Sequence, residues 1–209
     1  MRVFVFALPF EAAGFRSVSK SSQIWILGVA GISCAPRFED RLDQVEAPSL
    51  VVSAGLAGAL EPGLSVGDLV VGENSDPSFV KHLFSNEGPA WRRGFIHTVD
   101  SIVSTPREKA LLAAQTGAIV CDMESARIAE ICEGRGIPFA GVRAVSDTRE
   151  FDMPVPPQYL AHPNTGKPDV SGLLGCLLRK PSKIPKFFQM VRDASRARRA
   201  LHDFLSNLA

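Results

Sequence analysis

Two acidic residues, Glu124 and Asp147, each follow a short apolar run of the sequence. The run 118–121 is short and apolar, as a strand is, and 123–133 has helical spacing, so Glu124 is expected in the first helical turn after a strand end. The run 137–145 is expected to be a second buried strand that ends at Ser146 and Asp147. Because open α/β sheets bind ligands at the carboxyl ends of their strands, both carboxylates are candidate ligand-binding groups.

Each acid also has a purely structural explanation. Asp147 could cap a short turn, and Glu124 could be an acidic first-turn residue that the helix dipole favours. The two residues alone leave both explanations open.

The elements that must position these acids are predicted from apolar runs. Most of the runs are continuously apolar and not alternating, which is typical of strands covered on both faces. We therefore expect an α/β fold of three α-β-α layers, with a mixed, largely parallel, twisted sheet in the middle. The predicted strands are residues 3–8, 24–29, 50–53, 69–71, 95–99, 118–121 and 138–145. The predicted helices are residues 32–44, 106–115, 123–135 and 184–208.

Two further segments are expected to be irregular. Residues 74–91 are polar, and residues 152–168 contain five prolines, which favours a loop over a site.

Composition limits the classes of protein that fit. A chain of 209 residues with 45% hydrophobic content can form one domain, 1–209, and its net charge of +1 gives no sign of nucleic-acid binding. No run approaches the length of a membrane span. The four cysteines are dispersed, so neither a zinc site nor a disulfide framework is expected, and no metal or cofactor is predicted. They indicate buried thiols in a reducing cytoplasm: Cys34, Cys121, Cys132 and Cys176.

The C-terminal segment 179–209 differs from the rest of the chain. Eight basic residues stand against only Asp193 and Asp203, and with helical spacing they form a basic amphipathic helix. Such a helix can lie on a membrane surface, or it can cover the sheet with its apolar face, as terminal helices of this architecture normally do.

Three segments, taken together, resemble motifs of the nucleoside phosphorylase and nucleosidase superfamily, which includes methylthioadenosine/S-adenosylhomocysteine nucleosidase. They are Asp-Met-Glu-Ser-Ala at 122–126, Val-Arg-Ala-Val-Ser-Asp at 142–147, and the run 51–71 with its glycine turn Gly55-Leu-Ala-Gly58. The three motifs lie in the order that the family has, so the joint match is specific.

The resemblance implies cleavage of a purine N-ribosidic bond. It implies that Asp147 protonates the purine nitrogen N7, with Ser146 and Arg143 orienting it. Glu124 would bind the ribose hydroxyls and Met123 would pack under the sugar. A carboxylate in this position also favours the positive charge that develops on the sugar.

Further contacts follow from the same resemblance. Glu11, just beyond the first strand, matches a glutamate that activates water in methylthioadenosine nucleosidases, although it could also simply open a helix at Pro9. The glycine turn would bring backbone close to the ligand at Gly55, Leu56 and Ala57. The segment that contacts the base would include Ile102 and Val103.

The acceptor of the sugar is expected to be water. Many phosphorylases have a hydroxyl residue where Leu56 stands and an arginine where Ser53 stands, and Glu11 would repel phosphate. Arg37, Arg41 or an arginine of a neighbouring subunit could still complete a phosphate site.

A narrower resemblance concerns the hopanoid-associated phosphorylase branch, which is implicated in removing adenine from adenosylhopane. It rests on Leu8-Pro-Phe-Glu-Ala12, on Ser104-Thr-Pro-Arg-Glu-Lys109 and on the segment 179–185.

These resemblances imply an enzyme that hydrolyses a 5′-substituted adenosine such as methylthioadenosine, S-adenosylhomocysteine or an adenosylhopane-like compound. Phosphorolysis of the same bond, a non-catalytic nucleoside-binding protein and a membrane-surface scaffold are the alternatives. The three acids together favour the enzyme, because binding alone does not need them. The resemblance further implies a cytoplasmic homo-oligomer, either a dimer or a hexamer, with membrane contact through the C-terminal helix as a further option.

Overall fold

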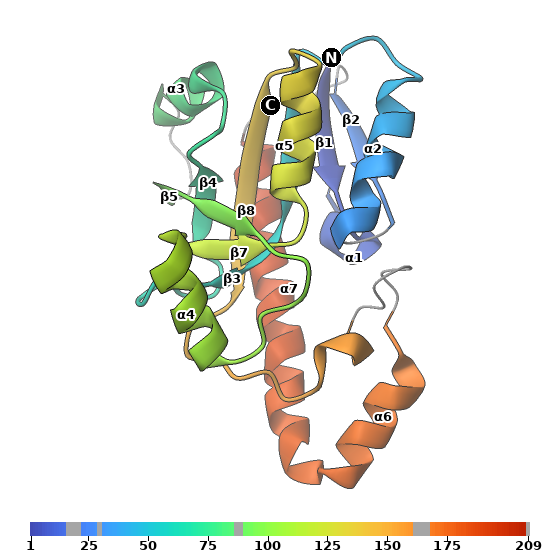
Figure 1. Cartoon of the computed structure of the whole chain (residues 1–209), viewed down its shortest axis with the longest axis vertical. Helices are drawn as coiled ribbons and strands as arrows, with labels where there is room; N and C mark the ends of the chain where they lie inside the picture. The colour runs from blue at the N-terminus through green and yellow to red at the C-terminus, as the bar shows by residue number, and fades with distance from the viewer. Residues whose placement is uncertain (16–21, 29–30, 86–89, 161–167, 208–209) are drawn as a thin grey trace.

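An eight-stranded sheet runs through the middle of the molecule (Figure 1). The computed structural model describes residues 1–15, 22–28, 31–85, 90–160 and 168–207. The strand order is β2-β1-β3-β8-β4-β5, and β6 and β7 lie beside the end of β3. The strands are β1 (Arg2–Phe6), β2 (Ser22–Ile26), β3 (Leu50–Ala59), β4 (Leu69–Gly72), β5 (Trp91–Gly94), β6 (Ile96–Thr98), β7 (Val120–Asp122) and β8 (Phe139–Asp147).

The centre of the sheet is parallel. Strand β1 pairs in parallel with β2 and β3, and β3 pairs in parallel with β8. Strand β4 joins β8 antiparallel, and β7 joins the far end of β3 antiparallel. The carboxyl ends of β1, β3 and β8 therefore meet at one edge of the sheet, where ligands collect in open α/β folds.

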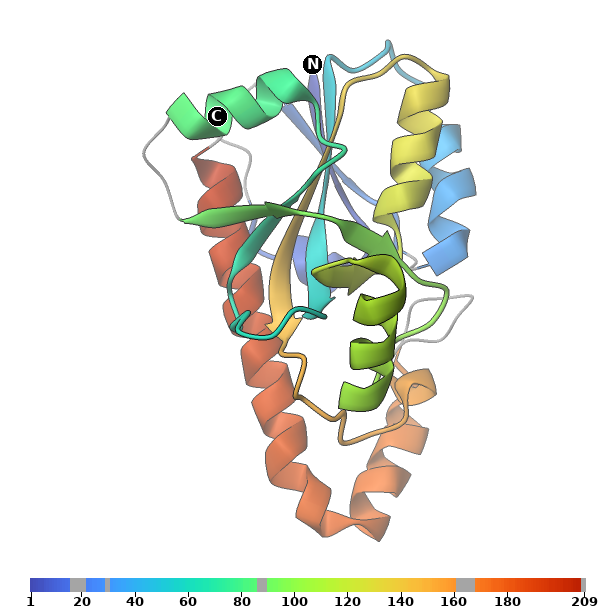
Figure 2. The ribbon, with the colours of Figure 1, turned by 60° about the vertical axis from the view of Figure 1, so that its left-hand side comes forward.

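Helices cover both faces, which makes the three layers that the sequence predicts. Helices α2 (Cys34–Leu42) and α5 (Ser125–Gly134) pack side by side on one face, and the second half of α7 (Ile184–Ser206) crosses the other (Figures 1 and 2). The shorter helices lie around the edges: α1 (Pro9–Ala12), α3 (Pro77–Ser85), α4 (Pro106–Thr116) and α6 (Val170–Arg179).

Each face of the sheet has its own apolar core. Leu201 and Phe204 of α7 pack with Val52 and Val142 of the sheet. On the other face, side chains of α2 and α5 pack against Val3, Val5 and Val51. A strand with apolar residues on both faces has no polar alternation, which is the reason why continuous apolar runs predict it.

Two helices were not predicted: one lies within a segment expected to be irregular, and the other follows the second such segment. Helix α3 occupies part of 74–91, and Asp76 begins it by accepting hydrogen bonds from the backbone N–H groups of Ser78, at 2.9 Å, and Phe79, at 3.2 Å. Helix α6 directly follows the proline-rich segment and starts at Asp169, which accepts from Gly172 N at 3.0 Å. Both starts are ordinary capping signals that the prediction missed.

The predicted glycine turn is wrong. Gly55 and Gly58 lie inside β3, which continues to Ala59 with one irregularity between Ala57 and Gly58. Glycines within a strand commonly mark a close approach of another group. Here side-chain carboxylates take the space: a Cβ on Gly55 would lie 2.8 Å from Glu11 Oε1, and one on Gly58 would lie 3.3 Å from Asp147 Oδ2.

The C-terminal helix is divided between two environments. Its second half carries the residues buried against the sheet, as the covering interpretation predicts. Its first half projects past the sheet and, with α6, forms a V-shaped arm, residues 168–196 (Figures 1 and 2). Large apolar side chains remain exposed on this C-terminal arm: Val170, Leu174, Leu178, Phe188 and Val191.

We expect Leu201→Ala to lower the free energy of unfolding by about 2 to 5 kcal/mol, because it leaves a cavity between α7 and the sheet. Leu201 is 0% exposed, whereas Leu178 in the C-terminal arm is 67% exposed. The same truncation, Leu178→Ala, is the matched control and should change the free energy by less than about 1 kcal/mol. Urea unfolding measures the free energy of both variants. Equal losses of free energy would contradict the finding that Leu201 is packed in the core while the C-terminal arm is exposed.

Candidate active site

A cavity of about 200 Å³ lies at the carboxyl edge of the sheet. Its walls come from the β1–α1 junction, the end of β3, the segment between β6 and α4, the β7–α5 junction and the end of β8. It is lined by Ala7, Leu8, Glu11, Leu56, Ala57, Gly58, Val99, Ile102, Val103, Cys121, Asp122, Met123, Glu124, Ser146, Asp147 and Met153.

Nine of the eleven site residues expected from the sequence line this cavity. The other two, Gly55 and Arg143, do not line it: Gly55 lies against Glu11, and Arg143 is buried and bonds to the lining residue Asp122. Met153, from the proline-rich segment, was not expected as a lining residue. Which of these residues act on a substrate stays a prediction.

Glu11 is held by two backbone donors. Leu8 N donates to its Oε2 at 2.9 Å, and Leu56 N donates to its Oε1 at 3.0 Å. Glu11 does lie in a helix that starts at Pro9, as the structural explanation proposed, but its side chain is buried and points at β3. Burial raises the pKa of Glu11 above its usual value, against the opposing effect of the two N–H donors.

Glu124 stands at the start of α5 without capping that helix. Its Oε1 accepts from Gly31 N at 2.8 Å, and the first free N–H of α5 goes instead to Asp122, whose Oδ2 accepts from Ser125 N at 3.0 Å. Burial, aided by the nearby charges of Glu11 and Asp122, raises the pKa of Glu124 to about 7. The side chain that caps α5 is therefore Asp122 and not Glu124.

Asp147 is the last residue of β8 and has a partner on each carboxylate oxygen. Ser146 Oγ donates to Oδ1 at 2.8 Å, and Lys109 Nζ forms an ion pair with Oδ2. Lys109 is 0% exposed and was missed by sequence reasoning. Helical spacing places it on the same face of α4 as Leu112 and Ala113, which pack against buried residues, and this was the signal available.

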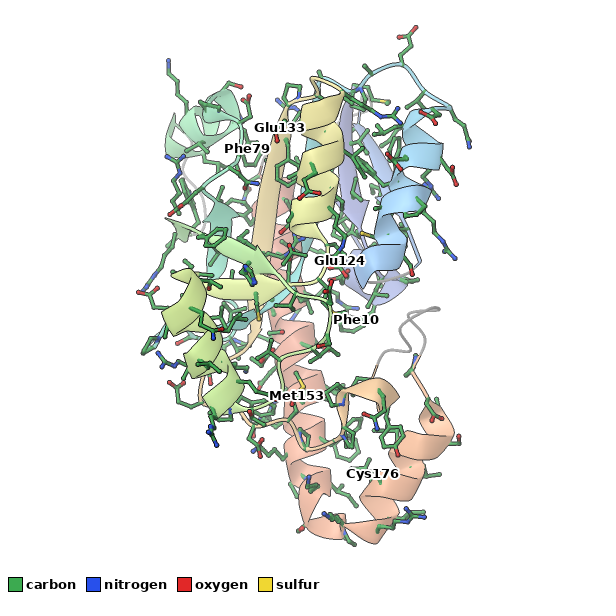
Figure 3. All side chains as sticks on the ribbon, in the orientation of Figure 1. Phe10, Phe79, Glu124, Glu133, Met153 and Cys176 are labelled. Carbon is green, nitrogen blue, oxygen red and sulfur yellow. The ribbon has the colours of Figure 1, made fainter. Side chains whose placement is uncertain are left out.

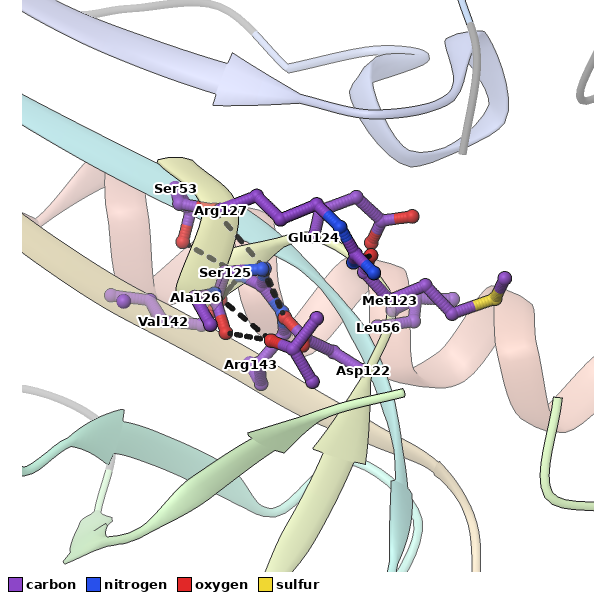
Figure 4. Close-up of polar contacts among 12 residues, drawn as sticks. Ser53, Leu56, Asp122, Met123, Glu124, Ser125, Ala126, Arg127, Val142 and Arg143 are labelled. Atoms are coloured by element: carbon purple, nitrogen blue, oxygen red, sulfur yellow. Dashed lines mark hydrogen bonds and ion pairs between the residues drawn. The ribbon is translucent and has the colours of Figure 1, made fainter. Parts of the chain in front are cut away.

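Arg143 is not beside Asp147, so the expectation that it orients this acid is wrong. Its Nε donates to Asp122 Oδ2 at 2.7 Å, and its Nη1 and Nη2 donate to Ser53 O at 2.7 Å and Ser53 Oγ at 3.0 Å (Figure 4). Thr98 Oγ1 donates to the other oxygen of Asp122 at 2.7 Å. The guanidinium thus links β8 to β3 and β7 under the cavity.

Arg37 and Arg41 have other partners than a ligand in the cavity. Arg37 Nη1 donates to Leu27 O at 2.8 Å, and Arg41 Nη2 donates to Ile26 O at 3.4 Å. Neither of these two described residues lines the cavity.

A second hollow, of about 340 Å³, lies at the opposite edge of the sheet. It is lined by residues at the starts of β1 and β3, and its carboxylate, Asp76, begins α3. Since ligands in such sheets bind at the carboxyl ends of strands, the cavity with Glu11, Glu124 and Asp147 is the candidate active site. Among the described residues, no group of three or more His, Cys, Asp or Glu side chains could hold a metal ion.

Comparison with known proteins finds similar sequences. A model of the phosphorylase superfamily matches residues 73–160, which include Met123, Glu124 and Asp147. A 5′-methylthioadenosine/S-adenosylhomocysteine nucleosidase from Shewanella baltica (strain OS185) is 29% identical over 140 residues, covering 52% of this chain and 59% of that protein. The chain thus matches about three fifths of the length of this curated relative.

Solved structures share the fold. A 5′-methylthioadenosine/S-adenosylhomocysteine nucleosidase from S. pneumoniae, solved with a transition-state inhibitor, has a TM-score of 0.65 at 18% identity and covers 100% of both chains. Futalosine hydrolase of Helicobacter pylori has a TM-score of 0.62 at 14% identity, covering 98% of this chain and 96% of that one. Together with the family model and the curated relative, they confirm the resemblance to the nucleoside phosphorylase and nucleosidase superfamily.

The raised pKa of Glu124 gives a testable dependence of stability on pH. The pKa of Glu124 is 4.5 in the unfolded chain and about 7 in the folded protein, so the folded state binds the proton more tightly. The stability that this proton contributes is fully present below about pH 4.5 and is lost as the pH rises through about 7. We expect the free energy of unfolding to fall by about 2 kcal/mol between pH 5 and pH 8. Glu124→Gln should reduce this fall, because an amide does not titrate.

The matched control is Glu133→Gln, at the other, exposed end of α5 (Figure 3). Urea unfolding at pH 5, 6, 7 and 8 should give this variant the same slope as the wild type. A wild-type slope that Glu124→Gln leaves unchanged would show that another group causes it.

Proposed function

We propose that this chain, which resembles the nucleoside phosphorylase and nucleosidase superfamily, cleaves the N-ribosidic bond of a 5′-substituted adenosine with water and releases adenine. The observation that carries the proposal is the convergence of three buried carboxylates, Glu11, Glu124 and Asp147, from three different elements on one cavity. Binding a neutral nucleoside would not need three buried acids, and burying charged groups is costly.

The proposed reaction needs a proton at the leaving base. Without it the purine would depart as an anion, so a positioned acid lowers the barrier. Asp147 fits this role because it ends β8 with its carboxyl group on the cavity, held by Ser146. Ile102 and Val103 supply apolar wall for the flat face of the base.

The sugar is proposed to lie between Glu124 and Met123. The Gly31 N–H holds one carboxylate oxygen of Glu124, which leaves the other for the ribose hydroxyls. In its ionised form Glu124 also stabilises the cationic sugar of the transition state. Because the pKa of Glu124 is raised to about 7, this form increases as the pH rises through neutrality.

Water as the acceptor is supported by the surroundings of Glu11. The backbone N–H of Leu56, which could otherwise face a phosphate, donates to Glu11, and Ser53 is bonded to Arg143. A carboxyl group with a raised pKa titrates nearer to neutral pH, which suits a base that takes a proton from water. Phosphorolysis and non-catalytic nucleoside binding remain the two alternatives that the test separates.

The substrate is proposed to be methylthioadenosine, S-adenosylhomocysteine or an adenosylhopane-like compound. The Shewanella relatives are nucleosidases for the first two, and Met153 and Val99 give the cavity additional apolar surface for a 5′ substituent. We further propose a cytoplasmic location, which the three buried free thiols suit, and, from the family resemblance, a homo-oligomer.

The C-terminal arm is proposed to touch an anionic membrane surface. Residues 168–196 contain six basic and two acidic residues, a net charge of +4, whereas the whole chain has +1. Exposed apolar side chains beside these charges are typical of interfacial helices. Within the described ranges, no helix is long and apolar enough to cross a membrane.

We expect the protein to release adenine from methylthioadenosine in phosphate-free buffer, with free methylthioribose as the sugar product. Asp147→Asn should lower kcat about 100-fold, the scale of a lost general acid. Chromatography of the base and mass analysis of the sugar measure both. Strict dependence on added phosphate with a sugar 1-phosphate would establish phosphorolysis, and tight nucleoside binding without turnover would establish the binding protein.

Binding to the membrane is tested on vesicles that contain phosphatidylserine. We expect salt-sensitive binding that the triple variant Arg179→Glu, Lys180→Glu, Lys183→Glu abolishes, since each basic residue near such a surface contributes about 1 kcal/mol. These residues lie in the arm and away from the sheet core, so folding is preserved. Lys81→Glu, exposed on α3, is the control. An intact protein that ignores these vesicles would refute the proposal.

A further inference from the structure

Lys109 is a buried lysine that bonds to Asp147 of the candidate active site and to the backbone that follows it. Its side chain extends from α4 to the end of β8 and is 0% exposed. Besides the ion pair with Asp147 Oδ2, Nζ donates to Thr148 O at 2.7 Å and to Phe151 O at 3.3 Å. The three acceptors match the three N–H groups of an ammonium ion, so the charged form is fully bonded.

The two backbone contacts fix the segment that follows Asp147. Thr148 and Phe151 precede Met153, which lines the cavity, and Met153 N donates to Ser104 O at 2.9 Å. Lys109 therefore holds the acid and the backbone next to it, while the wall at Met153 has its own bond to Ser104.

The pair also contains the proton that the reaction needs. As an ion pair, Asp147 is a carboxylate and its proton is on Lys109. An ion pair needs solvation much more than the corresponding neutral amine and acid do. A nucleoside that fills the cavity removes water from Asp147, the member of the pair that lines the cavity, and thereby favours transfer of the proton from Nζ to Oδ2.

We propose that Lys109 is the positioning residue of Asp147 and the source of the proton that Asp147 gives to the leaving base. The inference rests on the proposed function. It adds two points to that function. Lys109 acts through Asp147, and binding of the nucleoside causes Asp147 to take up the proton.

The step balances as follows in atoms and electrons. The Nζ–H bond of the Lys109 ammonium breaks, its electron pair stays on nitrogen, and the proton bonds to Asp147. The proton then bonds to N7 of the purine as the bond between C1′ and N9 breaks, with that electron pair going to the departing base. Water adds to C1′ and gives its proton to Glu11, and transfer of a proton through solvent restores the Lys109 ammonium.

The test compares two leaving groups on the same sugar. Adenine in methylthioadenosine needs a proton to leave, whereas 4-nitrophenolate, in the 4-nitrophenyl riboside with the same 5′ group, leaves as a stable anion. Lys109→Met should lower kcat for methylthioadenosine about 100-fold with KM within about threefold, and should change kcat for the nitrophenyl riboside less than about threefold. Lys81→Met, exposed on α3, should leave both rates unchanged.

A second variant keeps the test decisive if the unpaired Asp147 prevents Lys109→Met from folding. Asp147→Asn combined with Lys109→Met removes both charges, which a folded protein tolerates better than one unpaired buried charge. The double variant should cleave methylthioadenosine as slowly as Asp147→Asn alone, because two residues on one proton path are not additive.

Each outcome decides the inference. Equal losses on both substrates, no loss on methylthioadenosine, or a double variant about 100-fold slower than Asp147→Asn would each overturn the role of Lys109 while the proposed function stands. A wild-type protein that cleaves neither substrate would overturn the proposed function, and the inference would fall with it.

Discussion

The ion pair between Arg143 and Asp122 is the interaction on which the site depends. Both side chains are buried, and the guanidinium also bonds the backbone and the hydroxyl of Ser53. It thereby joins β8, β7 and β3, the strands that deliver Asp147 and Glu124 and receive Glu11. Loss of one partner from a buried pair costs about 3 to 5 kcal/mol, because the other charge is left uncompensated. The same positive charge opposes the rise in pKa of Glu11 and Glu124.

Near this ion pair, two glycines of β3 leave space for the carboxylates of Glu11 and Asp147. Strand β3 passes the cavity with Gly55 and Gly58, and the carboxylates of Glu11 and Asp147 occupy the space that side chains would fill. The backbone N–H of Leu56 then serves as a donor to Glu11. Burial makes Glu11 costly to ionise, and its two backbone donors offset part of that cost. The two glycines of β3 therefore help to determine where the carboxylates of Glu11 and Asp147 lie.

Helix α7 connects the core with the surface. Its second half covers the sheet, and His202 Nε2 lies 2.6 Å from Glu11 O, so α7 also contacts the short helix α1 that carries Glu11. Its first half leaves the sheet and, with α6, presents basic and apolar side chains to the outside. The same amphipathic pattern therefore covers the sheet in the second half of α7 and faces the outside in the first half. The two halves meet where the sheet ends.

The sequence by itself determined the layers and most of the cavity lining. Continuous apolar runs predict buried parallel strands, and such strands bring their carboxyl ends to one edge, so Glu124 and Asp147 could be placed together from spacing alone. Only the tertiary structure decided the partners of the charged groups. Arg143 forms an ion pair with Asp122, and Lys109 forms one with Asp147, 38 positions away in the chain. Spacing along the chain specifies which face of an element a side chain occupies, but which opposite charge it meets depends on how the elements pack, because a buried charge must find its partner in space.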